Sequence, residues 1–244
     1  MNRTAGIVVI GNEILSGKVT DTNSSFLTRE LRAMGVEVRR ISVIPDDLDD
    51  IARTVRRFHE TFDLVFTSGG VGPTHDDVTI EGIARAFERR VVREPELERK
   101  LREFYKEKVN DARLKMSEVP EGAELIYGGM LAFPTMKLEN VYILPGIPEI
   151  LQSKFLSIRE RFTADPFHLR IVYTREGEGA IAQHLNETLR VFPELLLGSY
   201  PKIGDPEYMV KVTLESKDRD YVERALAHLL SALPEGCVVK TEFR

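Results

Sequence analysis

A glycine-rich string at residues 67–79 holds the residue types best suited to chemistry in this chain. It lies between an apolar run at 64–66 and a helix-like run at 80–87. A glycine loop between strand and helix lets backbone N–H groups close on a phosphate without interference from Cβ atoms. Asp76 and Asp77 would repel a bare phosphate, so a divalent cation between acid and phosphate explains them better. The string therefore indicates a phosphorylated ligand, a metal and hydrolysis.

The alternative is a surface loop whose glycines only form a turn and whose Asp77 or Thr79 only caps the next helix. Several familiar solutions are excluded by the sequence. It contains no G-x-x-x-x-G-K-[ST] and no G-x-S-x-G, and its glycine loop reads G-G-x-G rather than G-x-G-x-x-G. The five histidines are scattered, and no His/Cys group has zinc spacing.

The composition is ordinary for a soluble globular protein with a substantial core. The chain has 244 residues, of which 42% are hydrophobic and 30% charged. A net charge of −5 disfavours non-specific nucleic-acid binding, and the single Cys237 excludes an internal disulfide framework. No apolar run approaches the roughly 20 residues that span a bilayer, and no signal-peptide core follows Met1. We expect a cytoplasmic protein that binds neither nucleic acid nor membranes.

Strands and helices are predicted to alternate through the first two thirds of the chain. Expected strands cover 6–10, 36–44, 64–67, 124–127, 131–138 and 141–144. Expected helices cover 24–34, a segment starting at 45–47, 80–87, a charged helix at 96–109, and 149–161. The repeated β-α order indicates a largely parallel sheet covered on both faces, with a hairpin at 139–140 joining the last two strands.

The order changes after residues 163–166, which we take as a domain boundary. Expected strands then cover 169–173, 196–200, 208–214 and 237–240, and expected helices cover 180–189 and 221–233. This β-α-β-β-α-β order is typical of small ferredoxin-like domains. The sequence thus predicts an α/β protein with two domains, residues 1–165 and a smaller α+β domain at 166–244.

Three loops leave the carboxyl ends of the expected parallel strands, where open sheets bind their ligands. The first covers residues 11–17 and runs on to 21–23, the second covers 45–47, and the third is the glycine loop. The turn at 145–148 would form the far wall of the same crevice. The candidate ligand-binding residues are Gly11, Asn12, Glu13, Gly17, Asp21, Asn23, Ser68, Gly69, Gly70, Gly72, Pro73, Thr74, Pro145 and Gly146.

Acidic residues of these loops are the candidate metal ligands and catalytic groups. Asp77 is the first choice as a ligand, Asp76 is its partner or the base for a water, and Asp46 is the third candidate. Each acid has a structural alternative, because Asp21, Asn23 or Asp46 would also serve as a helix N-cap. These alternatives stay open at the level of the sequence.

The motifs resemble those of the CinA family's molybdopterin-binding-like domain. The matching segments are residues 11–23, 68–79 and 144–149. A Leu-Gly-Ser-Tyr-Pro segment at 197–201 and a Lys-Val-Thr-Leu strand at 211–214 are similar to the version fused in eukaryotic FAD synthases. The resemblance implies a three-layer α/β/α sandwich like that of MogA and MoaB, with a smaller C-terminal α+β subdomain.

The same resemblance implies an activity. It is hydrolysis of the pyrophosphate bond of ADP-ribose, or of FAD, to AMP and a second monophosphate. The expected cofactors are a divalent metal (Mg, Co or Mn) and K⁺, and a homo-oligomer is expected. By motif, Asp46 and Asp77 match the paired acids of the molybdopterin-binding proteins, and Gly69, Gly70 and Gly72 match the phosphate loop.

Two further functions remain as alternatives. One is pterin binding or adenylylation in molybdenum cofactor assembly, and the other is noncatalytic nucleotide binding. Because the sequence shows no amidohydrolase or adenylyltransferase domain, neither nicotinamide mononucleotide deamidation nor FAD synthesis is expected.

Overall fold

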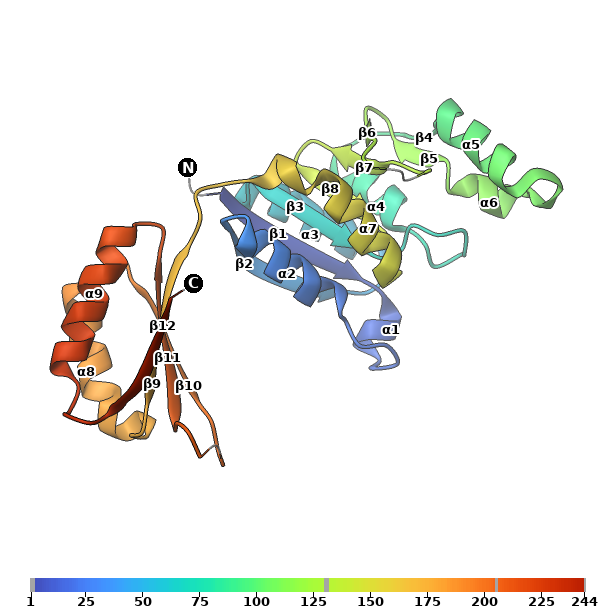
Figure 1. Ribbon diagram of the computed structural model, residues 1–244. Coiled ribbons are helices and arrows are strands. Elements are labelled where there is room, and N and C mark those ends of the chain that lie inside the picture. Colours follow the sequence, from blue (N-terminus) through green and yellow to red (C-terminus); the bar gives the residue numbers. More distant parts are fainter. Residues whose placement is uncertain (1–2, 130–131, 205, 244) are drawn as a thin grey trace. The chain divides into compact units, whose positions relative to one another are not determined.

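The chain divides between Ala164 and Asp165 into two units, each with its own sheet and core (Figure 1). The computed structural model describes residues 3–129, 132–204 and 206–243. Within these ranges no helix combines the length and the apolar character that crossing a bilayer requires.

A six-stranded sheet with the order β2-β1-β3-β8-β7-β6 forms the centre of the first unit. Its strands are β2 (Val36–Ile44), β1 (Arg3–Ile10), β3 (Leu64–Ser68), β8 (Val141–Leu144), β7 (Thr135–Leu138) and β6 (Glu124–Ile126). The first four run parallel, whereas β7 is antiparallel to both of its neighbours. The predicted mostly parallel sheet is therefore confirmed.

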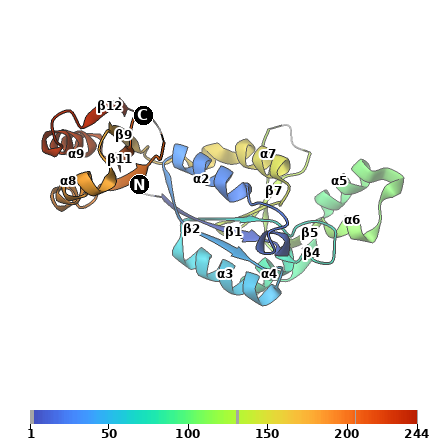
Figure 2. The same cartoon turned by 90° about the horizontal axis from the view of Figure 1, so that it is seen from below.

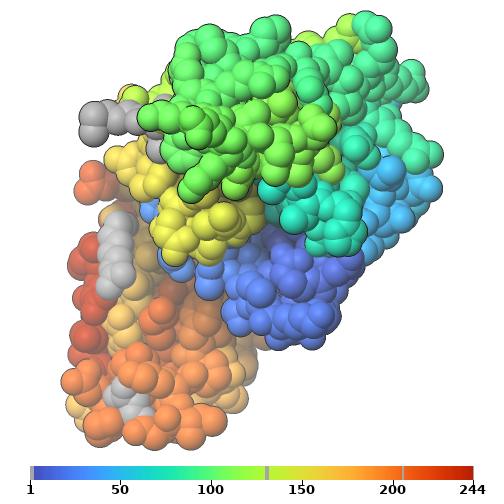
Figure 3. Space-filling view, turned by 90° about the vertical axis from the view of Figure 1, so that its right-hand side faces the viewer, coloured from blue at the N-terminus to red at the C-terminus, as the bar shows by residue number. Residues whose placement is uncertain are grey.

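Helices cover both faces of this sheet, as Figure 2 shows for α2 and α7 on one side and α3 and α4 on the other. The helices of these layers are α2 (Asn23–Ala33), α3 (Leu48–Thr61), α4 (Thr79–Ala86) and α7 (Pro148–Ile158), which continues as the 3₁₀ turn η2 (Arg159–Phe162). The short helix α1 (Asn12–Leu15) buries no residue and lies beyond the end of the sheet (Figure 1), and the dark blue segment that contains it faces the viewer in Figure 3. Side chains alternate along a strand, so β1 sends Ile7 and Val9 to one core and Val8 and Ile10 to the other. The predicted three-layer α/β/α arrangement is confirmed.

An aromatic cluster fills the core between the sheet and α7. Phe66 stacks on Tyr142 at 5.3 Å between ring centroids, and it meets Phe155 and Phe162 edge to face at 5.7 and 5.1 Å. Phe66, Phe155 and Phe162 are fully buried. Such rings bury large apolar areas in defined geometries, so the cluster fixes the position of α7 on the sheet.

The segment between α4 and β6 differs from the sequence prediction. A single charged helix was expected at 96–109, but the structure has α5 (Pro95–Tyr105), η1 (Lys106–Lys108) and α6 (Asp111–Lys115), flanked by the paired strands β4 (Val91–Arg93) and β5 (Glu118–Pro120). The helix ends early because Lys106 takes a positive φ of 49°. The strand expected at 131–138 begins at Thr135 after Pro134, and Leu131 lies outside the described residues.

The second unit is an antiparallel four-stranded sheet with the order β10-β11-β9-β12. Its elements are β9 (His168–Thr174), α8 (Glu178–Val191), β10 (Leu196–Pro201), β11 (Val210–Ser216), α9 (Arg219–Ala232) and β12 (Val238–Phe243). Its core combines strand residues such as Val172 and Val212 with the inner faces of both helices. This is the predicted ferredoxin-like order.

Shortening Phe155 to alanine should destabilise the first unit by about 3–5 kcal/mol, because a fully buried ring leaves a cavity. The matched control is Leu156→Ala, next on the same helix and 42% exposed, which should change stability by about 0.5 kcal/mol or less. Urea unfolding followed by circular dichroism measures both changes. Equal unfolding midpoints for the two variants would contradict the assigned core.

Candidate functional site

The carboxyl ends of β1, β3 and β8 meet at one edge of the first sheet, and a cavity of about 90 Å³ opens there. Strand β2 ends at the same edge, where the Gly11 amide donates to the Ile44 carbonyl at 3.1 Å. The predicted residues in the cavity wall are Glu13, Asp21, Asn23, Ser68, Gly69 and Gly146. The wall thus joins the first loop, the start of the glycine loop and the turn after β8, as the sequence predicted for one crevice.

Asn23 connects these three segments. Its Nδ2 donates to Ser68 Oγ at 3.0 Å and to the Gly146 carbonyl at 2.7 Å, and only 7% of the residue is exposed. Its Oδ1 is buried and has no hydrogen-bond partner among the described residues. An unsatisfied buried acceptor is costly, and Asn23 is one of the residues that line the cavity.

Asp21 and Asp46, the acids of the first two loops, accept hydrogen bonds from backbone amides. Asp21 Oδ1 accepts from the Ser24 amide at 3.0 Å and its other oxygen accepts from the Ser24 hydroxyl, so Asp21 caps the start of α2 while lining the cavity. Asp46 Oδ2 accepts from the Asn12 amide at 2.8 Å and thereby ties the two loops together. The N-cap of α3 is Asp47 rather than Asp46.

The glycine loop packs so closely on the sheet that side chains are excluded. A Cβ on Gly69, whose φ is 107°, would lie 2.1 Å from the Ile10 carbonyl oxygen, and one on Gly70 would lie 2.3 Å from Thr79 Oγ1. Thr79 anchors the loop, because its hydroxyl donates to the Gly69 carbonyl at 2.9 Å and its amide donates to the Gly70 carbonyl at 3.0 Å. The loop is thereby held against both β1 and α4.

Three successive amides of this loop, on Gly70, Val71 and Gly72, donate to no acceptor within the described part of the chain. They follow strand β3 directly at the sheet edge. Successive unbonded backbone amides in a turn form a concave anion-binding site. The loop is therefore suited to bind a phosphate.

Asp77 is turned into the loop itself. Its Oδ2 accepts from the Thr74 amide at 2.8 Å and from the Thr74 hydroxyl, and the cap of α4 uses no side chain. A Cβ on Gly72 would lie 2.7 Å from that oxygen. Lys115 from α6 donates to the carbonyls of Asp77 and Thr74 at 2.9 and 3.3 Å. The Asp77 carboxylate therefore stabilises the glycine loop itself, in addition to any ligand that this carboxylate binds.

Asp76 is more accessible than Asp77, with 58% of its side chain exposed. The neighbouring Thr74 side chain, and then the backbone amide of Asp76 itself, lower the pKa of Asp76 below its ordinary value. Asp76 is therefore an ionised acceptor at neutral pH. Across residues 3–129, 132–204 and 206–243, no three His, Cys, Asp or Glu side chains gather as a metal cluster, so Asp46, Asp76 and Asp77 do not form one.

The other predicted ligand residues lie outside the cavity wall, namely Gly11, Asn12, Gly17, Gly70, Gly72, Pro73, Thr74 and Pro145. The sequence prediction missed the rest of the wall, namely Val9, Ile10, Ile14, Val19, Thr20, Thr22 and Pro148. It also missed Lys115, which no motif marks, because α6 reaches the loop only through the pairing of β4 with β5.

Comparison with known proteins places this geometry in a family. A model described as a probable molybdopterin binding domain matches residues 6–162, and one described as the FAD synthase middle domain matches residues 166–242. The crystal structure of CinA from Thermoplasma acidophilum aligns with a TM-score of 0.61 and 31% identity, covering 66% of this chain and 98% of that chain. The chain therefore belongs to the CinA-like proteins with a molybdopterin-binding domain, which confirms the resemblance.

Relatives match along most of the chain. A protein of Archaeoglobus fulgidus is 39% identical over 220 residues, covering 90% of this chain and 93% of the relative. A probable FAD synthase of Caenorhabditis elegans is 32% identical over 262 residues, covering 95% of this chain and 50% of the relative. The chain thus spans about half the length of that FAD synthase.

Replacing Gly69 by alanine should destabilise the first unit by at least about 2 kcal/mol, since the new Cβ adds a clash with backbone to an unfavourable φ. Gly17→Ala is the control for φ alone. Gly17 also has a positive φ, 72°, but open space surrounds its Cβ position, so about 1 kcal/mol is expected. Urea unfolding compares the two, and equal losses would refute the close approach of the loop to β1.

Proposed function

We propose that this chain is a metal-dependent nucleotide pyrophosphatase that hydrolyses ADP-ribose, FAD or both to AMP and a second monophosphate. The observation that carries the proposal is the row of unbonded amides at Gly70, Val71 and Gly72, which directly follow Gly69 of the cavity wall. The similarity to a probable FAD synthase and to the FAD synthase middle domain supports a nucleotide as the ligand.

The loop amides would bind the pyrophosphate group. Backbone N–H groups aimed at phosphoryl oxygens stabilise the negative charge that builds there during hydrolysis, and they need no reorganisation when the reaction occurs. In the cavity wall, the unpaired Asn23 Oδ1 would accept a hydrogen bond from a ribose hydroxyl or a ring amine. Binding the phosphates and the sugar at separate points would orient the scissile bond.

The acids near the loop fit a hard divalent cation. Carboxylate oxygens are the ligands that Mg²⁺ prefers, and Mg²⁺ commonly binds through one or two carboxylates plus substrate phosphates. Asp77 and Asp76, with Asp46 as the third candidate, would hold it, and the absence of a three-acid cluster in the described residues agrees with a site that the substrate completes. When bound, the cation would neutralise phosphate charge and make a water more acidic.

Asp76 is the residue best placed to accept the proton of an attacking water. Its carboxylate is exposed, so a water can reach it. Asp77 would position the loop as well as bind metal, because its carboxylate holds Thr74. We also propose that K⁺ assists and that the active form is a homo-oligomer.

A pterin ligand is the second candidate function. The match of residues 6–162 to a probable molybdopterin binding domain favours it. Because one fold can carry several functions, this match alone does not choose between a pterin and a dinucleotide. Pterin retained by protein produced in a cofactor-making host, together with no hydrolysis, would favour this second function.

The deciding assay measures AMP released from ADP-ribose and from FAD, each with Mg²⁺, Co²⁺ or Mn²⁺, with and without K⁺. We expect metal-dependent AMP from at least one substrate. The assay also ranks the two substrates and the three metals. No AMP from either substrate with well-folded protein would overturn the proposal.

Asp77→Asn should lower AMP release about 100-fold or more, because it removes the charge while an amide oxygen can still accept from Thr74. The matched control is Asp220→Asn, an exposed acid in the first turn of α9, which should keep full activity. Circular dichroism and the unfolding midpoint report whether the loop variant stays folded. Activity of the folded Asp77→Asn variant close to that of the unmodified protein would refute the assigned role.

A further inference from the structure

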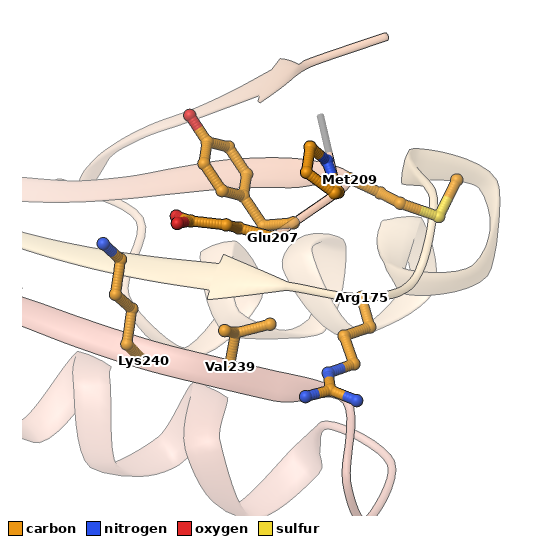
Figure 4. Close-up of a pocket in the computed structure, with 7 residues that line it drawn as sticks. Arg175, Glu207, Met209, Val239 and Lys240 are labelled. Atoms are coloured by element: carbon orange, nitrogen blue, oxygen red, sulfur yellow. The ribbon is translucent and has the colours of Figure 1, made fainter. Parts of the chain in front are cut away.

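A cavity of about 710 Å³ in the C-terminal unit is lined by two cations, Arg175 and Lys240. Figure 4 shows these two side chains on opposite sides of the cavity, and Lys240 already pairs with Glu242 at 3.3 Å. The two cations therefore do not converge on one ligand. A cation of the first unit, Lys115, has a more defined environment, because it contacts the glycine loop directly.

The position of Lys115 is fixed by the segment that carries it. Lys115 is the last residue of α6, and Leu114 before it and Ser117 after it are both buried. The Ser117 carbonyl accepts from the Glu94 amide at 2.9 Å, next to the pairing of β4 with β5. The backbone is thereby held on both sides of Lys115, so its side chain reaches the glycine loop from a defined point.

The ammonium of Lys115 bonds both ends of one turn. It donates to the Asp77 carbonyl at 2.9 Å and to the Thr74 carbonyl at 3.3 Å. Residues 74–77 form this turn, in which the Asp77 amide also donates to the Thr74 carbonyl at 3.3 Å. Asp76 lies within the turn, so the direction of its carboxylate depends on the two carbonyls that Lys115 holds.

This ammonium has no acidic partner of its own. Both of its hydrogen-bond acceptors are neutral carbonyls, and no carboxylate pairs with it anywhere in the described residues. Lys115 is half-buried, and a charge held partly out of water without a counterion is costly. It adds positive charge beside a loop that carries Asp76 and Asp77, which favours the approach of an anionic ligand.

The space around the ammonium is small. Lys115 lines a cavity of about 10 Å³ together with Val71, Gly72 and Asp77, and the first two carry two of the three unbonded amides of the loop. A cavity needs about 10–15 Å³ to hold a single water. Solvent therefore has little room to replace the two hydrogen bonds if the ammonium is removed, and the turn would lose their support.

We propose that Lys115 is a positioning residue for the hydrolysis proposed above, on which this role rests. Its ammonium closes the turn at 74–77, and the closed turn directs the carboxylates of Asp76 and Asp77 toward the metal and the attacking water. Lys115 acts through the turn and takes no part in breaking the bond. The segment from β4 to β5 thus supplies the site with a residue that lies outside all of the loop motifs.

Lys115→Met tests this role, because it keeps the length of the side chain but removes its charge and its N–H donors. In the metal-dependent AMP assay we expect kcat to fall about 10- to 100-fold, since small displacements of reacting groups have effects of this size, with little change in KM. The matched control is Lys108→Met, an exposed lysine of η1, which should keep full activity.

Chemical rescue separates this role from a purely structural one. Lys115→Ala removes the propylammonium part of the side chain, so added propylammonium should restore part of the lost kcat. Propanol, which is similar in size but uncharged, should not. A folded Lys115→Met variant with unchanged kcat would overturn the proposal, and so would a Lys115→Ala variant that propylammonium does not restore.

Hydrogen exchange of the peptide that contains residues 74–79 gives a readout that needs no activity. The hydrogen-bonded amides of Thr74, Asp77 and Val78 should exchange faster in Lys115→Met, and Lys108→Met should match the unmodified protein. If the unmodified protein releases no AMP, the proposed function fails, and exchange still shows whether Lys115 holds the turn. Equal exchange in Lys115→Met and the unmodified protein would refute that hold.

Discussion

The approach of Gly69 to the Ile10 carbonyl is the contact on which the rest of the site depends. A Cβ there would lie 2.1 Å from the backbone oxygen, so the chain can leave β3 beside β1 only through glycine. This contact holds the unbonded amides of 70–72 at the sheet edge, and Thr79 closes the loop against α4. The geometry of the loop is therefore a consequence of backbone packing, which the side chains of Thr79 and Asp77 reinforce.

Parallel pairing then brings the remaining parts together. Because β1, β2, β3 and β8 all end at one edge, loops separated by more than a hundred residues can share a wall. Asn23 is an example, because its side-chain amide donates hydrogen bonds to both Ser68 and Gly146. The side chain of Asn23 thus connects the first loop, the glycine loop and the turn before α7.

The two units place their polar groups in different ways. In the first, backbone amides and capped loops at a parallel edge provide the site, so few exposed cations are needed. In the second, antiparallel strands bring side chains from opposite positions onto one open face, and tyrosines alternate there with lysines.

Hydrophobic periodicity and turn residues were enough to predict the central sheet and the helices that cover it, because a long helix such as α3 buries a regular face that local sequence encodes. They also identified the glycine loop and part of the cavity wall. Tertiary structure alone decided what the acids do. Asp77 turns toward Thr74, and Lys115 reaches that loop through the short β4–β5 pair, whose three-residue strands are too brief to show a period. Contacts between distant short segments leave no local pattern, so the sequence by itself could not determine them.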